Sequence, residues 1–451
     1  MGRQIEKLAQ FVAQTRLEDI PESVRQHAKL VLLDTLGVIL AGSVRPEVRQ
    51  LRERLAGTAG RGATVFAPGW PAHDPRTAAL LNGIAGRAIE LCEGLRLVSG
   101  QAAMQVLPGV LAAGESASST GREMLAALIL GYEVAGRLCT AFTPRPLAHQ
   151  NGQASLLAAA AGGARVRGFG AAEVSRAMRI ATTLLMTPSY TNTVAGATAL
   201  NVAGGMSGFV GALAPELALA GFEAQDDAIE EALGKMVGEG FRPDGLLDEL
   251  GTRWEITRNY FRLYACCNPI HPALDCLHEI LARLRPLPDD IERIDVATYR
   301  FASVMRRPDP VNYFASKYSL PHAAAVMVVR GNAGHAAIDD AALHDPAIVA
   351  LRERVHVTED AGMSAVAPRL RPARVTVTLK DGRRDTHACD SHRGDFQQPF
   401  AESEIRGKFH ELAGEVLTAE GVSQAEARVE HCDEWASVRE FAESLRRHAR
   451  S

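Results

Sequence analysis

The sequence predicts a mainly α-helical protein, with a large all-α domain and a smaller α+β lid domain inserted before the C-terminal helices. Three observations support this fold class. Apolar residues recur at helical spacing through the first half of the chain, alternating segments begin after residue 285, and charged helical sequence returns after residue 401. We expect the helical domain to comprise residues 1–267 and 400–451, and the lid domain residues 268–399.

Apolar faces indicate the first two helices. The apolar side chains that share one face of the opening segment are Ile5, Leu8, Ala9, Phe11 and Val12. Pro21 is expected to begin the second helix, because proline fits a first turn, where its missing N–H has no helical partner. Apolar residues from Val24 to Leu36 then follow at helical spacing.

Five further helices follow the same pattern, at residues 71–88, 107–116, 124–138, 154–165 and 171–185. Thr120 precedes the third of these, and its side-chain oxygen is of the kind that caps a helix N-terminus. Alanine and glycine dominate the apolar faces, and aromatic residues make up only 5% of the chain. We therefore expect the helices to approach one another closely.

The lid domain is predicted from two alternating segments, residues 293–299 and 373–379. Residues 380–383, Lys-Asp-Gly-Arg, have the composition of a hairpin turn, so residues 386–389 are the expected partner strand. Helical patterns lie between the two segments, at residues 321–329 and 347–354.

The composition excludes several classes of protein. Hydrophobic residues make up 47% and charged residues 23% of the 451 residues, as in soluble globular proteins. The net charge is −4 and no basic stripe is present, so we expect no nucleic-acid partner. The seven cysteines are scattered without a C-x-x-C pair, which predicts neither a disulfide framework nor structural zinc.

The termini and apolar stretches predict a cytoplasmic location. The opening residues lack the apolar core of a secretory signal. The most apolar stretches, such as residues 156–164, are short and rich in small residues, so we expect no membrane span.

Several motifs, in order along nearly the whole chain, carry a resemblance to a known family. They lie at residues 32–37, 78–83, 106–108, 131–134, 264–267, 271–275, 317–321, 393–395 and 408–409. Together they resemble the MmgE/PrpD family, which includes 2-methylcitrate dehydratase, cis-aconitate decarboxylase and iminodisuccinate epimerase.

The resemblance implies a homodimer whose site lies between the two domains and uses neither a cofactor nor a metal. It also implies a small carboxylate or carbonyl compound as substrate. In the family a proton next to that group is removed, and water or carbon dioxide is then lost, or the proton is returned on the other face.

The sequence departs from the family at the expected site. The family's Asp-Phe-Asp-Asp segment reads Glu-Leu-Cys-Glu at residues 90–93, and Gln101 replaces its main catalytic histidine. Leu200 replaces the basic residue of its Gly-Ala-Thr-x-Arg-Asn segment, and Arg262 replaces the lysine of its Phe-Lys-Pro-Tyr segment. The second histidine remains, as His149.

These departures change the charge of the site in one direction. A tricarboxylate needs several cationic donors to offset the cost of removing its charges from water. Gln101 and Leu200 remove positive charge and add neutral or apolar surface. We therefore expect a substrate that is less acidic and more apolar than methylcitrate, such as a specialised metabolite or a mono-acid.

The expected catalytic residues are His149, Glu90, Lys317 and Tyr318. The expected substrate-binding residues are Gln101, Arg262, Tyr264, Cys267, Leu200 and Asn192. His149 is the preferred acid or base, because imidazole transfers protons near neutral pH. Arg262 and Lys317 would hold the acid group of the substrate. Tyr318 and Gln101 would donate hydrogen bonds to a developing enolate.

Most of these assignments have a structural alternative. His149 could cap a helix, Lys317 could be exposed, and Tyr318 could be a packed tyrosine. Arg262 could form a salt bridge between the domains, and Asn192 could belong to an ordinary turn.

The acidic and cysteine residues leave similar alternatives. Glu90 and its neighbour Glu93 are each either a general base or a structural acid, paired with Arg87 or Arg96. Cys267 is either a small buried hydrophobe or a weak acid that faces the pocket. His271 and Asp275 lie four residues apart on one helix face, which favours a structural pair over catalysis.

Three functions remain open on the sequence. The preferred one is a cofactor-independent lyase that abstracts a proton and eliminates water or carbon dioxide. The second is an isomerase, epimerase or cyclase that uses the same proton transfer without elimination. The third is a homologue that binds a ligand without catalysis.

Overall fold

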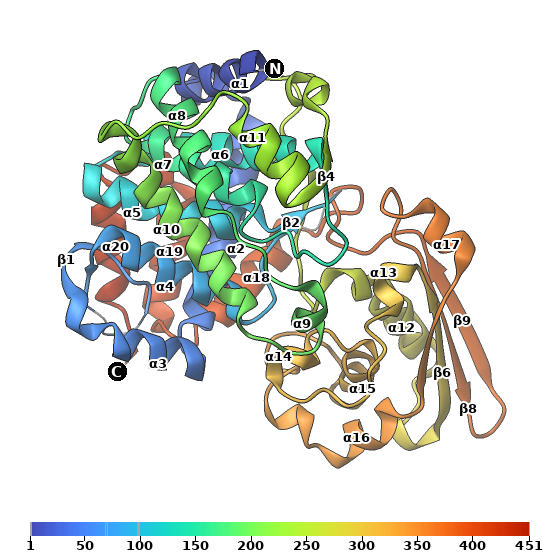
Figure 1. Ribbon diagram of the computed structural model, residues 1–451. Helices are drawn as coiled ribbons and strands as arrows, with labels where there is room; N and C mark the ends of the chain where they lie inside the picture. Colours follow the sequence, from blue (N-terminus) through green and yellow to red (C-terminus); the bar gives the residue numbers. More distant parts are fainter. Residues whose placement is uncertain (1, 68, 70, 97–99, 451) are drawn as a thin grey trace.

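The computed structural model describes residues 2–67, 69, 71–96 and 100–450. It has a large helical domain and a smaller domain built on a four-stranded sheet, which lie side by side (Figure 1). This arrangement confirms the predicted fold class.

The helical domain is built from the first half of the chain. Its helices there are α1 (Gly2–Gln14), α2 (Glu22–Gly42), α3 (Pro46–Arg54), α4 (Pro75–Ala88), α5 (Ala102–Ala117), α6 (Gly121–Ala141), α7 (Ala154–Val166), α8 (Ala171–Ala181), α9 (Tyr190–Val194), α10 (Leu200–Leu219) and α11 (Ala228–Glu231). Its short strands are β1 (Ala59–Ala63), β2 (Gly94–Leu95), β3 (Phe142–Pro144), β4 (Gly238–Phe241) and β5 (Asn259–Tyr260).

Local sequence explains where several of these helices begin. Pro21 immediately precedes α2, as expected from its fixed φ and missing N–H. The Thr120 hydroxyl accepts a hydrogen bond from the Glu123 amide, and the Glu123 carboxylate accepts one from the Thr120 amide. This reciprocal capping box begins α6 where the sequence predicts it.

Glycine allows the close helix packing that the alanine-rich faces predict. A Cβ atom added at Gly83 of α4 would lie 2.8 Å from the Cα atom of Gly205 in α10. One added at Gly163 of α7 would lie 1.9 Å from the carbonyl oxygen of Gly211 in α10. Any side chain at these positions would push the helices apart, so α10 depends on glycine for its contacts with α4 and α7.

The smaller domain packs helices on a mixed sheet. Its helices are α12 (His271–Leu284), α13 (Arg300–Ser303), α14 (Tyr313–Ser316), α15 (Leu320–Arg330), α16 (Pro346–Arg352) and α17 (Ala361–Val366). Its strands are β6 (Ile291–Thr298), β7 (Val355–Glu359), β8 (Ala373–Leu379) and β9 (Arg384–Cys389), in the order β7-β6-β8-β9.

The predicted hairpin is present, but one strand was not predicted. β8 and β9 are antiparallel and are joined through Gly382, whose φ of +87° suits glycine. β7 pairs in parallel with β6 and places Ile294 opposite Val355. The two buried valines of β7 make a pattern too short to be recognised in the sequence.

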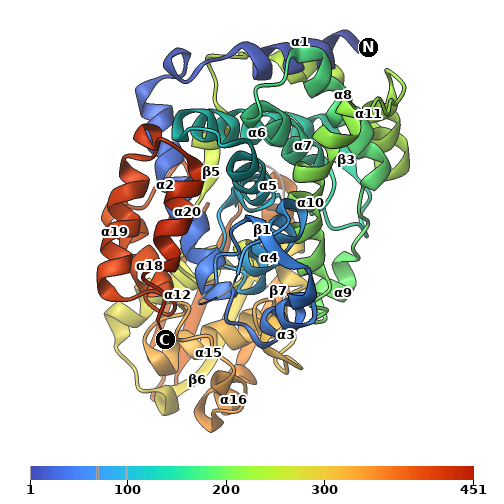
Figure 2. The same cartoon turned by 90° about the vertical axis from the view of Figure 1, so that its left-hand side faces the viewer.

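The chain returns to the helical domain through α18 (Glu402–Ala413), α19 (Ala419–Glu430) and α20 (Val438–Arg446). Figure 2 shows these helices alongside α2. The Lys408 ammonium donates 2.6 Å to Asp34 Oδ1 in α2 and 2.7 Å to the Leu91 carbonyl. The end of the chain thereby braces the segment that precedes Glu93.

Two helices correct the expectation about apolar stretches. By length and composition, α6 and α10 could each cross a membrane, and α2 with α3 would form a third span if counted as one bent pair. The apolar window of α6 is 94% buried inside the protein and that of α10 is 61% buried. Alanine and larger aliphatic residues raise the mean hydropathy of both helices, and here the alanines and glycines serve close helix packing.

Candidate active site

A cavity of about 750 Å³ lies between the two domains. The helical domain contributes Leu147 and residues of α9, and the smaller domain contributes Tyr299, Phe301 and Arg371. Figure 1 shows α9 next to the smaller domain, where the Asn312 side chain donates 3.1 Å to the Gly196 carbonyl. The cavity wall is therefore assembled from segments far apart in the sequence.

His149 lies in the loop before α7 and is nearly fully buried. Its amide donates to the Pro188 carbonyl over 2.8 Å, and the Tyr190 amide donates to the Leu147 carbonyl over 2.9 Å. These antiparallel contacts place the imidazole against the Tyr190 ring, with centroids 5.7 Å apart.

Burial determines the charge of His149, and one hydrogen bond determines which ring nitrogen carries the proton. Burial, and then the nearby Arg87 guanidinium, lower the pKa of His149 to about 3, so the ring is neutral at pH 7. The Asn151 amide donates 3.2 Å to Nδ1. Nδ1 is therefore the acceptor, and the ring proton lies on Nε2. His149 does not itself line the cavity, whereas Tyr190, on which it stacks, does.

Tyr190 connects the cavity to the residues behind it. Its ring lines the cavity and lies 4.9 Å from the Phe301 ring, centroid to centroid. Its buried hydroxyl has no hydrogen-bond partner among the described residues. Burial and the neighbouring Cys267, Tyr318 and Tyr299 raise the pKa of Tyr190, so it stays a neutral donor.

Glu90 is the centre of a buried ion cluster near His149. It forms an ion pair with Arg87, and its Oε1 lies 2.7 Å from Arg262 Nη1. The Tyr318 hydroxyl donates to Oε2 over 3.0 Å and accepts from Arg87 over 2.9 Å. Glu90 has a φ of +52°, a strained conformation that tends to persist only where surrounding contacts enforce it. Of the alternatives for this carboxylate, pairing with Arg87 is present.

The guanidinium group of Arg262 is already hydrogen-bonded to other groups of the protein. Its Nε donates 2.7 Å to the Cys92 carbonyl, and its Nη1 also donates to the Glu90 and Cys266 carbonyls. Binding a substrate carboxylate at Arg262 would compete with these contacts.

Two other expected site residues point to different partners. The Lys317 ammonium donates 2.8 Å to the Ile338 carbonyl and lies 4.1 Å from the centroid of the Tyr313 ring. Burial lowers the pKa of Lys317 to about 7, but the residue does not line the cavity. The Tyr264 hydroxyl donates 2.9 Å to Asp275.

The remaining expected residues differ in their surroundings. Gln101 precedes α5, and its buried Oε1 has no partner among the described residues. Leu200 is buried at the start of α10, whereas Asn192 is exposed on α9. Cys267 is half-buried, and burial raises its pKa to about 12, so it is a neutral thiol.

Glu93 supports the site from within the fold. Its Oε1 accepts 2.9 Å from the Ala103 amide in the first turn of α5, and its Oε2 accepts 2.6 Å from the Tyr132 hydroxyl. Burial raises the pKa of Glu93 to about 7. Arg96 pairs with Asp395 instead of either glutamate.

His271 and Asp275 do not form the expected pair. The His271 ring nitrogen Nε2 lies 3.1 Å from the Cys266 carbonyl oxygen. Asp275 accepts from Tyr264 and from the Arg393 amide. Both side chains hold neighbouring segments, so their role is structural, although each has a different partner.

Tyr299 and Arg371 line the cavity but were not predicted as site residues. Tyr190 lies with Asn192 in the polar run of residues 190–193, and only the phase of α9 shows that Tyr190 faces the cavity. Tyr299 and Arg371 follow β6 and precede β8, outside every family motif. Within the described ranges, no three His, Cys, Asp or Glu side chains are grouped in a way that could hold a metal ion.

Comparisons with known proteins cover nearly the whole chain. The profile of the MmgE/PrpD N-terminal domain matches residues 6–238, and that of the MmgE/PrpD C-terminal domain matches residues 264–434. The cis-aconitate decarboxylase-like protein oryM of Aspergillus oryzae is 25% identical over 98% of this chain and 96% of its own. A cis-aconitate decarboxylase of Aspergillus terreus is 23% identical over 97% and 95%.

Proposed function

Because the chain belongs to the MmgE/PrpD family and is similar to cis-aconitate decarboxylases, we propose that it is a cofactor-independent decarboxylase. Its substrate would carry the leaving carboxylate on a carbon next to a carbonyl, or next to a double bond conjugated with one. The electron pair left by carbon dioxide is then delocalised as an enolate or dienolate, which takes up one proton from solvent to give the product. The relatives named as cis-aconitate decarboxylases support elimination as the type of reaction.

The neutral donor at His149 is the observation that carries this proposal. A neutral imidazole with its proton on Nε2 can stabilise an enolate without first giving up a charge. The unpartnered Tyr190 hydroxyl lies close by and can supply a second donor. Such donors stabilise negative charge that develops as the carbon–carbon bond breaks.

The surrounding groups favour decarboxylation over dehydration or epimerisation, which both need a base. The Glu90 carboxylate is already bound by two guanidinium groups and a hydroxyl. The Cys267 thiol stays protonated, and Lys317 is turned toward Ile338. Within the part of the chain that the structure describes, we find no unpaired carboxylate next to His149 that could act as the base.

The experiment measures carbon dioxide release in D₂O from a panel of mono- and dicarboxylic acids with an adjacent carbonyl or alkene. We expect one carbon dioxide and one incorporated deuterium per turnover. The deuterium lies at the carbon that loses carbon dioxide or, for an alkene substrate, at the far end of the former double bond, and less acidic members are favoured over cis-aconitate. Deuterium in recovered substrate without carbon dioxide would instead identify an isomerase. Binding without either change would identify a non-catalytic homologue, and ordinary rates on cis-aconitate or methylcitrate would contradict the less acidic substrate.

We also propose that the protein is a homodimer, with α10 in the interface. Helix α10 runs across the front of the large domain in Figure 1. Four apolar residues recur on one side of this helix, and none is fully buried: Val202, Met206, Phe209 and Leu213. Sedimentation equilibrium is expected to give twice the chain mass, and Phe209→Glu to give the monomer. Leu287→Glu, at another exposed apolar residue, should leave the dimer intact. A monomeric wild type would contradict the proposal.

A further inference from the structure

Arg371 is a buried cation for which the described residues provide no acidic partner. The residue is 5% exposed and lines the interdomain cavity. Its Nη1 donates to the Asn268 side-chain oxygen, and its Nη2 donates 2.8 Å to the Arg96 carbonyl. Both acceptors are neutral, and no carboxylate among the described residues forms an ion pair with Arg371.

The charges around Arg371 do not balance. Arg96 is a second buried cation, whose carbonyl accepts from Arg371, and its own ion-pair partner is Asp395. Two buried guanidinium groups therefore share one carboxylate. An uncompensated charge away from water is costly, and an anion from outside the chain would remove that cost.

The Arg371 guanidinium is held in a defined orientation. His392 Nδ1 lies 2.7 Å from the Arg393 carbonyl oxygen, and His392 Nε2 lies 2.8 Å from Asn268 Nδ2. The histidine thereby presents Nε2 as acceptor, which turns the amide oxygen of Asn268 toward Arg371. A guanidinium group has five N–H donors and only two of those of Arg371 have partners here, so the others remain for a ligand.

A second, independent feature of the same cavity also points to a ligand. Tyr299 is 4% exposed and lines the cavity beside Arg371. Its buried hydroxyl has no hydrogen-bond partner in the described part of the chain. Burial raises the pKa of Tyr299 to about 12, so the hydroxyl is a neutral donor. A guanidinium and a phenol on one wall match the oxygens of a carboxylate.

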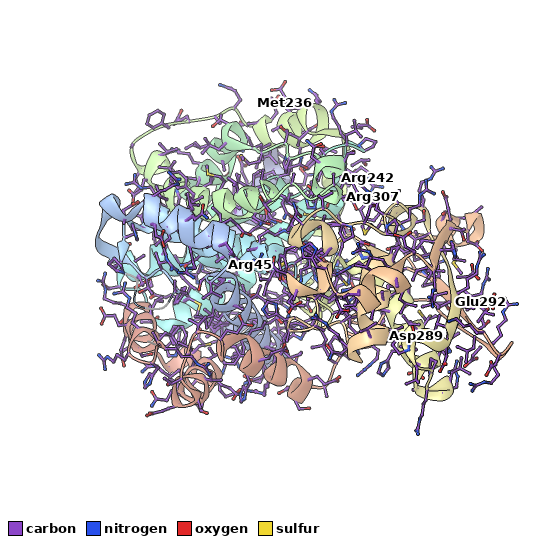
Figure 3. All side chains as sticks on the ribbon, turned by 90° about the horizontal axis from the view of Figure 1, so that it is seen from below. Arg45, Met236, Arg242, Asp289, Glu292 and Arg307 are labelled. Atoms are coloured by element: carbon purple, nitrogen blue, oxygen red, sulfur yellow. The ribbon has the colours of Figure 1, made fainter. Side chains whose placement is uncertain are left out.

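The other arginines of the cavity are already paired. Arg300 is bound to Glu359 over 3.4 Å and Arg307 to Asp309 over 3.6 Å, and both are exposed. Figure 3 labels Arg307 near the boundary of the two domains. Arg371 is thus distinguished by burial and by the absence of a described carboxylate partner.

Most of the remaining wall is apolar, and its uncharged polar residues are Thr191 and Ser364. Leu147, Val194, Phe301, Val304 and Pro368 line the space around Arg371 and Tyr299. The cavity of about 750 Å³ is much larger than a carboxylate requires. Tyr190 lines the same space, so a ligand bound at Arg371 can extend along the apolar wall to Tyr190, which stacks on His149.

We propose that Arg371 and Tyr299 bind one carboxylate of an acid whose apolar chain occupies the interdomain cavity. This carboxylate serves as an anchor and is distinct from the group that reacts near His149. The substrate class is therefore an acid with an apolar chain, in which one carboxylate is retained. The identification of this ligand as the substrate depends on the proposed function, whereas its binding can be measured without turnover.

The test uses octanoate, 1-octanol and acetate as probes in isothermal titration with the wild-type protein. Octanoate carries both the carboxylate and the chain, and each of the other probes lacks one of them. We expect octanoate to bind at least 10-fold more tightly than either. Equal binding of octanoate and 1-octanol would overturn the proposal without any variant.

Two variants and one control then locate the anchor. Arg371→Met should weaken octanoate binding at least 10-fold and leave 1-octanol unchanged, and Tyr299→Phe should weaken octanoate about 3-fold. Arg383→Met is the matched control at an exposed arginine that pairs with Asp381 over 2.8 Å outside the cavity, and it should change binding less than 2-fold. Unchanged octanoate affinity in a folded Arg371→Met would refute the anchor. If that variant does not fold, unchanged affinity in Tyr299→Phe would do so.

These outcomes are separable from the proposed reaction. Octanoate binding that depends on Arg371, together with no carbon dioxide release from any acid in the panel, would retain the anchor and refute the decarboxylase. Carbon dioxide release together with octanoate binding that does not depend on Arg371 would retain the decarboxylase and refute the anchor.

Discussion

Replacing His149 by alanine is expected to lower kcat/KM for decarboxylation by about 100-fold or more, within the range for a positioned proton-transfer or donor group. The loss would fall on kcat, because the Nε2 proton is needed most when negative charge develops on the substrate. The control is His356→Ala, at an exposed histidine of β7, which should keep activity within 2-fold of wild type.

The variant His149→Gln distinguishes a donor from a base. A glutamine amide retains an N–H donor but cannot take up a proton, so it should recover part of the activity lost in His149→Ala. Equal inactivity of the two variants would identify His149 as a base. Full activity in His149→Ala would remove the residue from the mechanism.

The pH profile provides a further check on the same residue. The pKa of His149 is lowered to about 3, so the neutral ring predominates at every pH above about 4. Titration of His149 should therefore cause no change in kcat/KM between pH 5 and pH 8. The activity should fall only as pH drops toward 3. A midpoint near 6.5 that disappears in His149→Gln would contradict this assignment.

The variant Glu90→Gln is expected to lower the free energy of unfolding by about 3–5 kcal/mol. The substitution keeps the shape of the side chain but removes the charge that Arg87 and Arg262 share. Both guanidinium groups would remain buried without their common partner, which is the costly result. The shift of the urea midpoint, multiplied by a shared slope, measures the effect.

Glu249→Gln provides a matched control. Glu249 also has a positive φ, of +51°, and pairs with Arg253 over 2.6 Å, but its side chain is exposed. An exposed pair contributes little, so this variant should lose less than about 1 kcal/mol. Similar small losses in both variants would show that burial does not decide the strength of the Glu90 cluster.

Local features of the fold were predictable because their causes are local. The capping box of Thr120 and Glu123 and the glycine turn of the β8–β9 hairpin involve residues close in sequence. β7 was missed because its five residues form a strand only when β6 lies alongside. Helix α10 consists largely of small residues, and its place depends on close contacts with α4 and α7.

The candidate site was predictable only in part. His149 and Glu90 occupy positions that the family resemblance indicates, and the structure brings both near Arg87. Lys317 and Asn192 occupy comparable positions, yet one is turned toward Ile338 and the other is exposed. Residue type and order do not show which way a side chain faces.

The sequence by itself determined the family and the mainly helical fold with its smaller α+β part, and it has the neutral residues Gln101 and Leu200 where the family resemblance implies cations. Only the tertiary structure decided which charges remain available to a ligand. Arg262 forms an ion pair with Glu90. Arg371 donates to the carbonyl of Arg96, which is 275 residues away in the sequence, and has no described acidic partner. The physical reason is that a buried charge is balanced by whatever the fold brings next to it, and that neighbour is seldom a neighbour in sequence.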